Sequence, residues 1–157
     1  MNPVTTRTPR QTRLREGLLR VVTGAVEFSS RGHADVVKIT DAVRENVAAS
    51  GVHDGTVTVF APGATGAVTT VEYEPGMIED FRDVLETIAP SDRVWRHNVN
   101  NGDGNGHSHI RAALVGPSVT VPIVDGRLTL GTWQEIAFCD FDARPRERSV
   151  VVQVMGV

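Results

Sequence analysis

Two histidines stand one residue apart, His107 and His109, at the end of a segment rich in Gly and Asn, NNGDGNGHSH (100–109). A third histidine, His97, precedes this segment. Imidazole is a common ligand of divalent metals, and three protein ligands with one water molecule form a catalytic zinc site. Residues two apart on an α-helix point about 200° away from each other, so His107 and His109 can converge only if one precedes the helix. The spacing therefore permits a metal site of His97, His107 and His109 without requiring it.

The same segment also fits a phosphate site. The residues SHIRAALVG (108–116) have the apolar spacing of a short helix, which Asn105 or Ser108 could cap. A helix that starts after a glycine-rich loop presents backbone N–H groups to an anion. A second glycine-rich loop, APGATG (61–66), follows a predicted strand. A simpler interpretation stays open for both loops, in which the polar side chains bond only to backbone and water. The candidate phosphate-binding residues are Gly63, Thr65, Asn105 and Arg111.

Glu72 is a candidate because it lies in a strand pattern, TTVEYEP (69–75), rather than on a helix face. Its carboxylate could act as a general base or a metal ligand, or could simply face solvent. Further along, GTWQ (131–134) offers Trp133 as a stacking platform and Gln134 as an amide donor and acceptor. The candidate catalytic residues are Glu72, His97, His109 and Gln134.

Hydrophobic periodicity and turn signals predict the elements that position these residues. Thr40 is expected to cap the first helix, and Asp125-Gly126 to form the type I′ turn of a hairpin. The basic segment ARPRER (143–148) is expected to be a solvated turn. Strands are predicted over residues 18–30, 55–63, 67–76, 118–131, 134–142 and 148–156, and helices over residues 40–51, 77–90 and 108–116. This order predicts an α+β fold of mostly antiparallel, sandwich-like β-sheets with two to three helices packed on one side.

Length and charge narrow the function classes. A chain of 157 residues suits one domain, taken as residues 21–157 behind a flexible N-terminal arm of residues 1–20. A net charge of −3 gives no electrostatic footprint for nucleic acid. No apolar run approaches the ~20 residues that span a membrane, and no secretory signal is present, so a cytoplasmic protein is expected. The single cysteine, Cys139, lies in an apolar run typical of a buried thiol.

Several ordered stretches resemble the YjbQ family, whose members are described as secondary thiamine-phosphate synthases. The resemblance runs from about Lys38 to the C-terminus. The stretches that carry it are VFAPGATGAVTTVEYEPG, RHN, NGHSHIRAALVGPSVTVPI, GRLTLGTWQEIAFCDFD and RPRERSVVVQVMG.

Site residues of the family can be placed on this chain one by one. In this resemblance His97, Asn105 and His109 match polar positions of the family's Asn-rich loop. Glu72 matches the acid that follows the Thr-containing strand, and Gln134 matches the Gln of GTWQ. Two positions differ: many relatives have His in place of Gly63 and Asp in place of His107.

The resemblance implies a homotrimer and a reaction that joins a hydroxymethylpyrimidine diphosphate to a thiazole phosphate with release of pyrophosphate. Such a reaction needs stabilisation of the leaving diphosphate, by helix N-terminal amides, by Arg111 and by a divalent metal such as Mg²⁺. No organic cofactor is expected, whereas Zn²⁺ or Mg²⁺ is possible. Two alternatives stay open: a metal-dependent hydrolase with the three imidazoles around an activated water, and a non-catalytic trimer that binds a phosphorylated ligand.

Overall fold

The computed structural model of the chain describes residues 14–157, so residues 1–13 of the predicted arm lie outside the described part. Residues 14–19 have no regular secondary structure. Within them, the Arg15 guanidinium pairs with the carboxylates of Asp54 and Asp125. These ion pairs attach this part of the arm to the domain.

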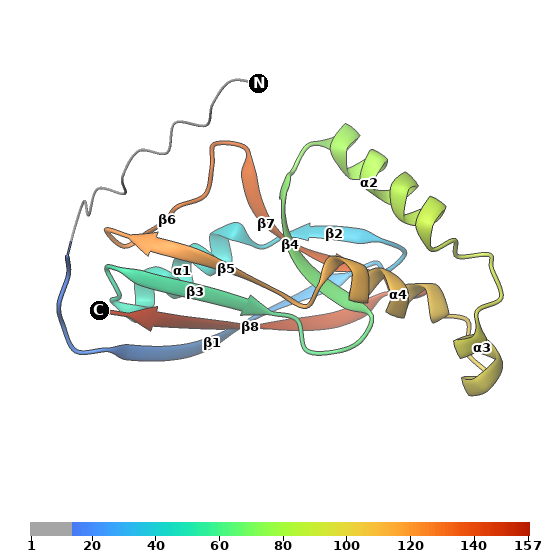
Figure 1. Cartoon of the computed structure of the whole chain (residues 1–157), viewed down its shortest axis with the longest axis horizontal. Coiled ribbons are helices and arrows are strands. Elements are labelled where there is room, and N and C mark those ends of the chain that lie inside the picture. Colours follow the sequence, from blue (N-terminus) through green and yellow to red (C-terminus); the bar gives the residue numbers. More distant parts are fainter. Residues whose placement is uncertain (1–13) are drawn as a thin grey trace, which may run out of the picture.

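Eight strands of the described part form two antiparallel sheets (Figure 1). The larger sheet has the order β1-β8-β3-β5-β6, and the smaller has the order β2-β7-β4. The predicted α+β class with antiparallel sheets is therefore confirmed. The strands are β1 (Arg20–Ser30), β2 (Asp35–Lys38), β3 (Gly55–Phe60), β4 (Gly66–Glu72), β5 (Ser118–Val124), β6 (Arg127–Leu128), β7 (Gln134–Asp140) and β8 (Arg146–Gly156).

Residues 14–157 also form four helices, three of which gather at one end of the molecule in Figure 1. Helices α2 and α4 cover the outer face of the smaller sheet, whereas α1 packs against the larger sheet and β7. No helix of this part of the chain is long and apolar enough to cross a bilayer. The helices are α1 (Thr40–Ser50), α2 (Pro75–Ile88), α3 (Arg96–Asn101) and α4 (Gly106–Val115).

The middle strand of the smaller sheet, β7, is buried on both faces. Ile136 and Phe138 face the larger sheet and α1, while Ala137 and Cys139 face α2 and α4. Burying a large apolar side chain contributes about 1.5–3 kcal/mol, so both layers stabilise this strand. Cys139 is buried, which confirms the sequence prediction. This burial raises the pKa of its thiol to about 12.

Two short elements are missing from the sequence prediction. β2 has four residues and follows three successive residues in the left-handed region, Gly32, His33 and Ala34, with φ of 71°, 52° and 60°. α3 has six residues, RHNVNN, and buries none of them, so it has no apolar periodicity to detect. The predicted hairpin turn is confirmed, because Asp125 and Gly126 have φ of 51° and 72° as a type I′ turn requires.

Helix α2 begins two residues earlier than the sequence pattern predicts. The two carboxylate oxygens of Glu74 accept hydrogen bonds from the N–H groups of Gly76 and Met77, each at 2.9 Å. These bonds hold the pKa of Glu74 below its ordinary value. Pro75 occupies the first helical position, where its fixed φ suits the helix and no N–H is needed.

Thr40 does not cap α1, contrary to the sequence prediction. The N-cap residue is Ile39, and no side chain caps this helix. The hydroxyl of Thr40 is buried and accepts a hydrogen bond from the Ile136 N–H at 2.8 Å. It therefore joins the start of α1 to β7.

Thr40→Val should lower the free energy of unfolding by about 1–3 kcal/mol, because it leaves the buried Ile136 N–H without an acceptor. Thr40→Ser keeps the hydroxyl and should be the more stable of the two variants. Urea unfolding followed by circular dichroism measures both. A Thr40→Val protein as stable as the wild type would contradict this role.

Candidate functional site

The start of α4 gathers several of the polar residues predicted from the sequence. Asn105 is the N-cap residue and His107 lies in the first turn. The side chain of Asn105 does not cap the helix; the Gly106 N–H donates instead to Asn98 Oδ1 of α3, at 2.8 Å. Glycine is required at this position because a Cβ atom would lie 2.6 Å from Trp95 Cβ. The segment that contains α3 therefore packs closely on the start of α4.

Two buried polar atoms at this helix start have no hydrogen-bond partner among the described residues. They are Asn105 Oδ1 and His107 Nδ1. His107 is only 5% exposed, and its Nε2 lies 3.5 Å from Ser108 Oγ. Buried polar groups in proteins are nearly always bonded to protein, water or ligand. The two atoms therefore have hydrogen-bonding capacity that water or a polar ligand could meet.

The surroundings of His107 favour its neutral form. Burial lowers the pKa of His107, and the charge of Arg111 lowers it further. Glu86 and Asp142 act in the opposite direction, and His33 in the same direction. A neutral imidazole can accept a proton at one nitrogen while it donates from the other. His107 can therefore serve as a general base as well as a hydrogen-bonding group.

His97 and His109 form a separate pair. Their ring centroids are 4.4 Å apart with 36° between the ring planes. Both nitrogens of His97 are engaged, Nδ1 with Asp103 Oδ1 at 3.1 Å and Nε2 with Asn101 Nδ2 at 2.9 Å. These bonds are satisfied together when His97 carries its proton on Nδ1, so that Nε2 accepts from the amide.

The three imidazoles therefore do not converge. His107 and His109 both lie within α4, where residues two apart point in nearly opposite directions. His109 stacks on His97, whereas His107 is buried near the charges of Arg111 and Asp142. No three His, Cys, Asp or Glu side chains of residues 14–157 are grouped in a way that could hold a metal ion. This arrangement does not fit a catalytic zinc held by three histidines.

Arg111, predicted to bind phosphate, is directed at α2. It is 3% exposed and donates from Nε and a terminal nitrogen to the carbonyl of Ala89, at 3.0 and 2.8 Å. It also pairs with Glu86. The Ser91 N–H and hydroxyl, together with Arg111, lower the pKa of Glu86 to about 2. In this structure Arg111 holds the C-terminal end of α2 against α4.

Thr65, from the second glycine-rich loop, belongs to a buried network of charges. Its hydroxyl accepts a hydrogen bond from Arg148 at 3.1 Å and lies 3.4 Å from the Asp142 carboxylate. Asp142 also accepts from Arg146 at 2.9 Å. Burial raises the pKa of Asp142, but Arg146 and the backbone N–H of Ala143 lower it more. Thr65 is therefore close to Asp142, one of several charges that act on His107.

Gly63, in the same loop, has a φ of 122°, a conformation that side chains with a Cβ atom rarely adopt. Apart from its chain neighbours, no atom of residues 14–157 lies within 4 Å of the place where its Cβ would be. The loop is therefore open at Gly63, and its backbone is accessible to a ligand.

Glu72 and Gln134 face each other at the other end of the smaller sheet. They are register partners of β4 and β7, whereas Gly66 and Asp140 are partners at the opposite end. Six strand residues separate the two ends by roughly 20 Å. The amide of Gln134 is used locally, since it accepts from the Gly131 N–H at 3.1 Å and donates to Thr70 Oγ1 at 3.0 Å. The structure thus brings Glu72 to Gln134 but not to the start of α4.

The sequence analysis missed several polar residues near the start of α4. His33 was not among the candidates, and the basic turn was assigned to solvent. In the structure Asp140 is fully buried and bonded by Arg148. The available signal was the alternation of acids in CDFD and arginines in RPRER, which places Asp140 and Asp142, and Arg146 and Arg148, each on one side of the backbone.

Comparison with known proteins decides the family. The family model described as UPF0047 protein YjbQ-like matches residues 24–157. This chain belongs to the YjbQ family. YjbQ-like relatives include a UPF0047 protein of Methanothermobacter thermautotrophicus, 35% identical over 138 residues that cover 88% of this chain and 94% of that protein. A UPF0047 protein of Mycobacterium tuberculosis is 41% identical over 115 residues, covering 73% of this chain and 84% of that protein.

Solved YjbQ-like structures have the same fold. A YbjQ-like protein of unknown function from Sulfolobus solfataricus superposes with a TM-score of 0.85 at 30% identity, covering 89% of this chain and all of that one (100%). A hypothetical protein from Aeropyrum pernix gives a TM-score of 0.80 at 32% identity, with 87% and 99% covered. The fold is thus shared over nearly the whole domain.

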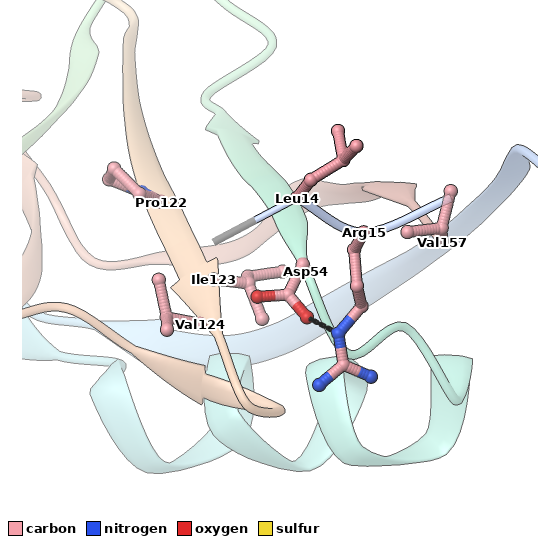
Figure 2. Close-up of a pocket in the computed structure, with 8 residues that line it drawn as sticks. Leu14, Arg15, Asp54, Pro122, Ile123, Val124 and Val157 are labelled. Carbon is pink, nitrogen blue, oxygen red and sulfur yellow. Dashed lines mark ion pairs between the residues drawn. The ribbon is translucent and has the colours of Figure 1, made fainter. Parts of the chain in front are cut away.

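A cavity of about 700 Å³ in this YjbQ-like chain lies away from the predicted site residues (Figure 2). It is lined by the segment before β1, the start of β3, the end of β5 and the C-terminal residue Val157. The Arg15 and Asp54 side chains that line it form an ion pair, shown dashed in Figure 2. No histidine lines this cavity, so its volume alone does not identify it as the candidate functional site.

Acid should destabilise the protein partly through His107. Because the pKa of His107 is lowered in the folded protein, the unfolded chain takes up this proton first as the pH falls. The stability that neutral His107 contributes is fully present above the ordinary histidine pKa of about 6.5. It is lost as the pH falls through the lower pKa that His107 has in the folded state. Between about pH 7.5 and about pH 5, urea unfolding should show a larger loss of stability for the wild type than for His107→Gln. An equal loss in the two proteins would show that this imidazole is not shielded.

Proposed function

We propose that this protein is an enzyme that acts on a phosphorylated small molecule, and that the ligand binds at the start of α4. The supporting observation is the pair of buried atoms Asn105 Oδ1 and His107 Nδ1, which have no partner among the described residues. One phosphorylated ligand can meet both needs, because a phosphate oxygen accepts from an imidazole N–H and a ligand hydroxyl or amine donates to the amide oxygen.

Three further observations support a phosphate at this place. α4 has ten residues, long enough for its N-terminus to attract an anion. The neutral imidazole of His107 lies in its first turn, where it can donate a hydrogen bond and exchange a proton. The backbone of the loop at Gly63 is open, which would let a ligand approach closely. Arg111 is engaged with Ala89 and Glu86, so the proposal does not depend on it.

The named candidate reaction is thiamine-phosphate synthesis, supported by the family resemblance. In that reaction a pyrimidine methylene carbon is transferred from diphosphate to the ring nitrogen of a thiazole phosphate, and pyrophosphate leaves. The helix N-terminus would stabilise the leaving group, and His107 would exchange a proton with it. Many relatives have other residues at the positions of Gly63 and His107. The variants and the substrates must therefore be tested on this protein itself.

Purified protein supplied with the two phosphorylated substrates and Mg²⁺ should form thiamine phosphate, measured by chromatography. His107→Gln should lower kcat/KM by about 100-fold or more, as expected for loss of a general acid–base group. His53→Gln removes an exposed imidazole outside the site and should leave kcat/KM unchanged. Absence of product with folded protein, together with failure to rescue a thiamine-requiring strain, would reject this reaction.

A homotrimer is also proposed, because no helix among residues 14–157 covers the outer face of the larger sheet. This face carries Phe60, Met155 and Val21, which are 43%, 46% and 56% exposed. The edge strand β1 is eleven residues long, and long exposed edges favour pairing with another chain. Both features suit a subunit interface.

Light scattering coupled to size exclusion should give a mass of about 51 kDa, three times the 17.0 kDa of the chain. A mass of 17.0 kDa, constant over a wide range of protein concentration, would refute the trimer.

A further inference from the structure

A second polar hollow lies between the 31–35 turn and α2. A cavity of about 330 Å³ is lined by Arg31, His33 and Arg82, among others. An adjoining hollow of about 220 Å³ shares Arg31 and Arg82 and adds Tyr73 and Glu79. Because the two hollows share two side chains, they form one groove, here called the Arg82 groove. None of the residues assigned to the start of α4 lines it.

The backbone at one end of the groove is held in an unusual conformation. Non-glycine residues in the left-handed region cost about 1–2 kcal/mol each, and both His33 and Ala34 are in it. The turn is fixed by three hydrogen bonds: His33 N–H to the Asp142 carbonyl at 2.7 Å, Asp35 N–H to the Gly32 carbonyl at 3.0 Å, and Arg82 Nε–H to the Ala34 carbonyl at 3.0 Å. Conformations of this kind persist where the surroundings fix them, and they are common at binding sites.

The charges of the groove are unevenly compensated. Arg31 is paired with Asp35, at 2.7 Å between a terminal nitrogen and Oδ1. Arg82 donates a hydrogen bond to a neutral carbonyl and forms no direct ion pair among residues 14–157. Its charge acts on Asp35, which also lines the groove and whose pKa is lowered by Arg31 and, to a smaller extent, by Arg82. At the other end, Glu74 is used to cap α2, whereas Glu79 has no ion-pair or hydrogen-bond partner in the described part of the chain. At the turn, two arginines therefore face one carboxylate, that of Asp35, and the carboxylate of Glu79, three residues before Arg82 on α2, is available in the smaller hollow.

The smaller hollow has an aromatic side chain in its wall. Tyr73 donates its hydroxyl proton to the Val36 carbonyl at 2.9 Å, which fixes its ring, and Pro75 and Ile78 line the same hollow. A fixed aromatic wall binds a ring without loss of side-chain freedom.

We propose that the Arg82 groove binds a small zwitterion with a ring, whose carboxylate or phosphate lies at Arg82 and His33 and whose amine lies at Glu79. This site goes beyond the function proposed for the start of α4 and uses different residues.

The probe is 4-(aminomethyl)benzoate, titrated into the full chain and followed by two-dimensional amide NMR. The amide signals of Gly32, Asp35 and Glu79 should move together. Benzoate, which lacks the amine, and benzylamine, which lacks the anion, should each bind at least about fivefold more weakly, the value of one ion pair near 1 kcal/mol. Equal affinity for all three compounds, or movement of the Ser108 signal alone, would overturn the proposal.

Variants distinguish the loss of a charge in the groove from an effect on folding and from an effect at the start of α4. Arg82→Gln and Glu79→Gln should each weaken the probe about fivefold, since each loses one ion pair near 1 kcal/mol. Arg82→Lys keeps the charge and should bind within about threefold of the wild type, even though the bond to Ala34 is lost. Arg127→Gln, an exposed arginine on β6, and Asn105→Ala at α4 should bind like the wild type. Wild-type affinity in Arg82→Gln, loss in Arg82→Lys equal to that in Arg82→Gln, or loss in Asn105→Ala would reject the groove.

Discussion

A buried ion pair joins the two sheets at the end of the molecule where the candidate site lies. Asp140 of β7 is fully buried, and both its oxygens accept hydrogen bonds from Arg148 of β8, at 2.6 and 2.7 Å. A buried charge costs several kcal/mol unless it is paired, so neither side chain can be lost without the other. Arg148 also bonds Thr65, and the carbonyl of Asp142 holds the 31–35 turn through the His33 N–H. The loop at Thr65, the 31–35 turn and the Asp142 carboxylate thus lie around one interaction between the sheets.

The surroundings of the start of α4 decide which of its polar groups are available to a ligand. His107 points toward the buried charges and stays neutral, while His109 points the other way and stacks on His97. Arg111, one turn further, is occupied by the end of α2. What is left for a ligand is an imidazole, an amide and the end of a helix, which suits a polar or anionic ligand better than a metal held by three histidines.

The sequence analysis named Glu72 and Gln134 as candidate catalytic residues together with two histidines. The smaller sheet separates these two residues from the start of α4. Glu72 and Gln134 end β4 and begin β7, roughly 20 Å from the strand end that carries Asp140. Within one chain they cannot touch the small ligand that is proposed for Asn105 and His107. Their distance from the imidazoles follows from the length and register of two strands, which local motifs do not reveal.

Local sequence determined much of the fold by itself. Alternating apolar residues gave most strands, helical spacing gave α1, α2 and α4, and Asp125-Gly126 gave its turn, because backbone geometry and period act over a few residues. It also indicated the family, but it named His97, His107 and His109 as a possible metal set, whereas His107 and His109 diverge on one helix. Only the tertiary structure decided that Thr40 bonds β7 instead of capping α1, that Arg111 closes α2, and that Asp140 meets Arg148. Each of these contacts depends on a partner in another element, which the packing of sheets and helices brings close. The chemistry of a side chain alone does not predict which partner it will meet.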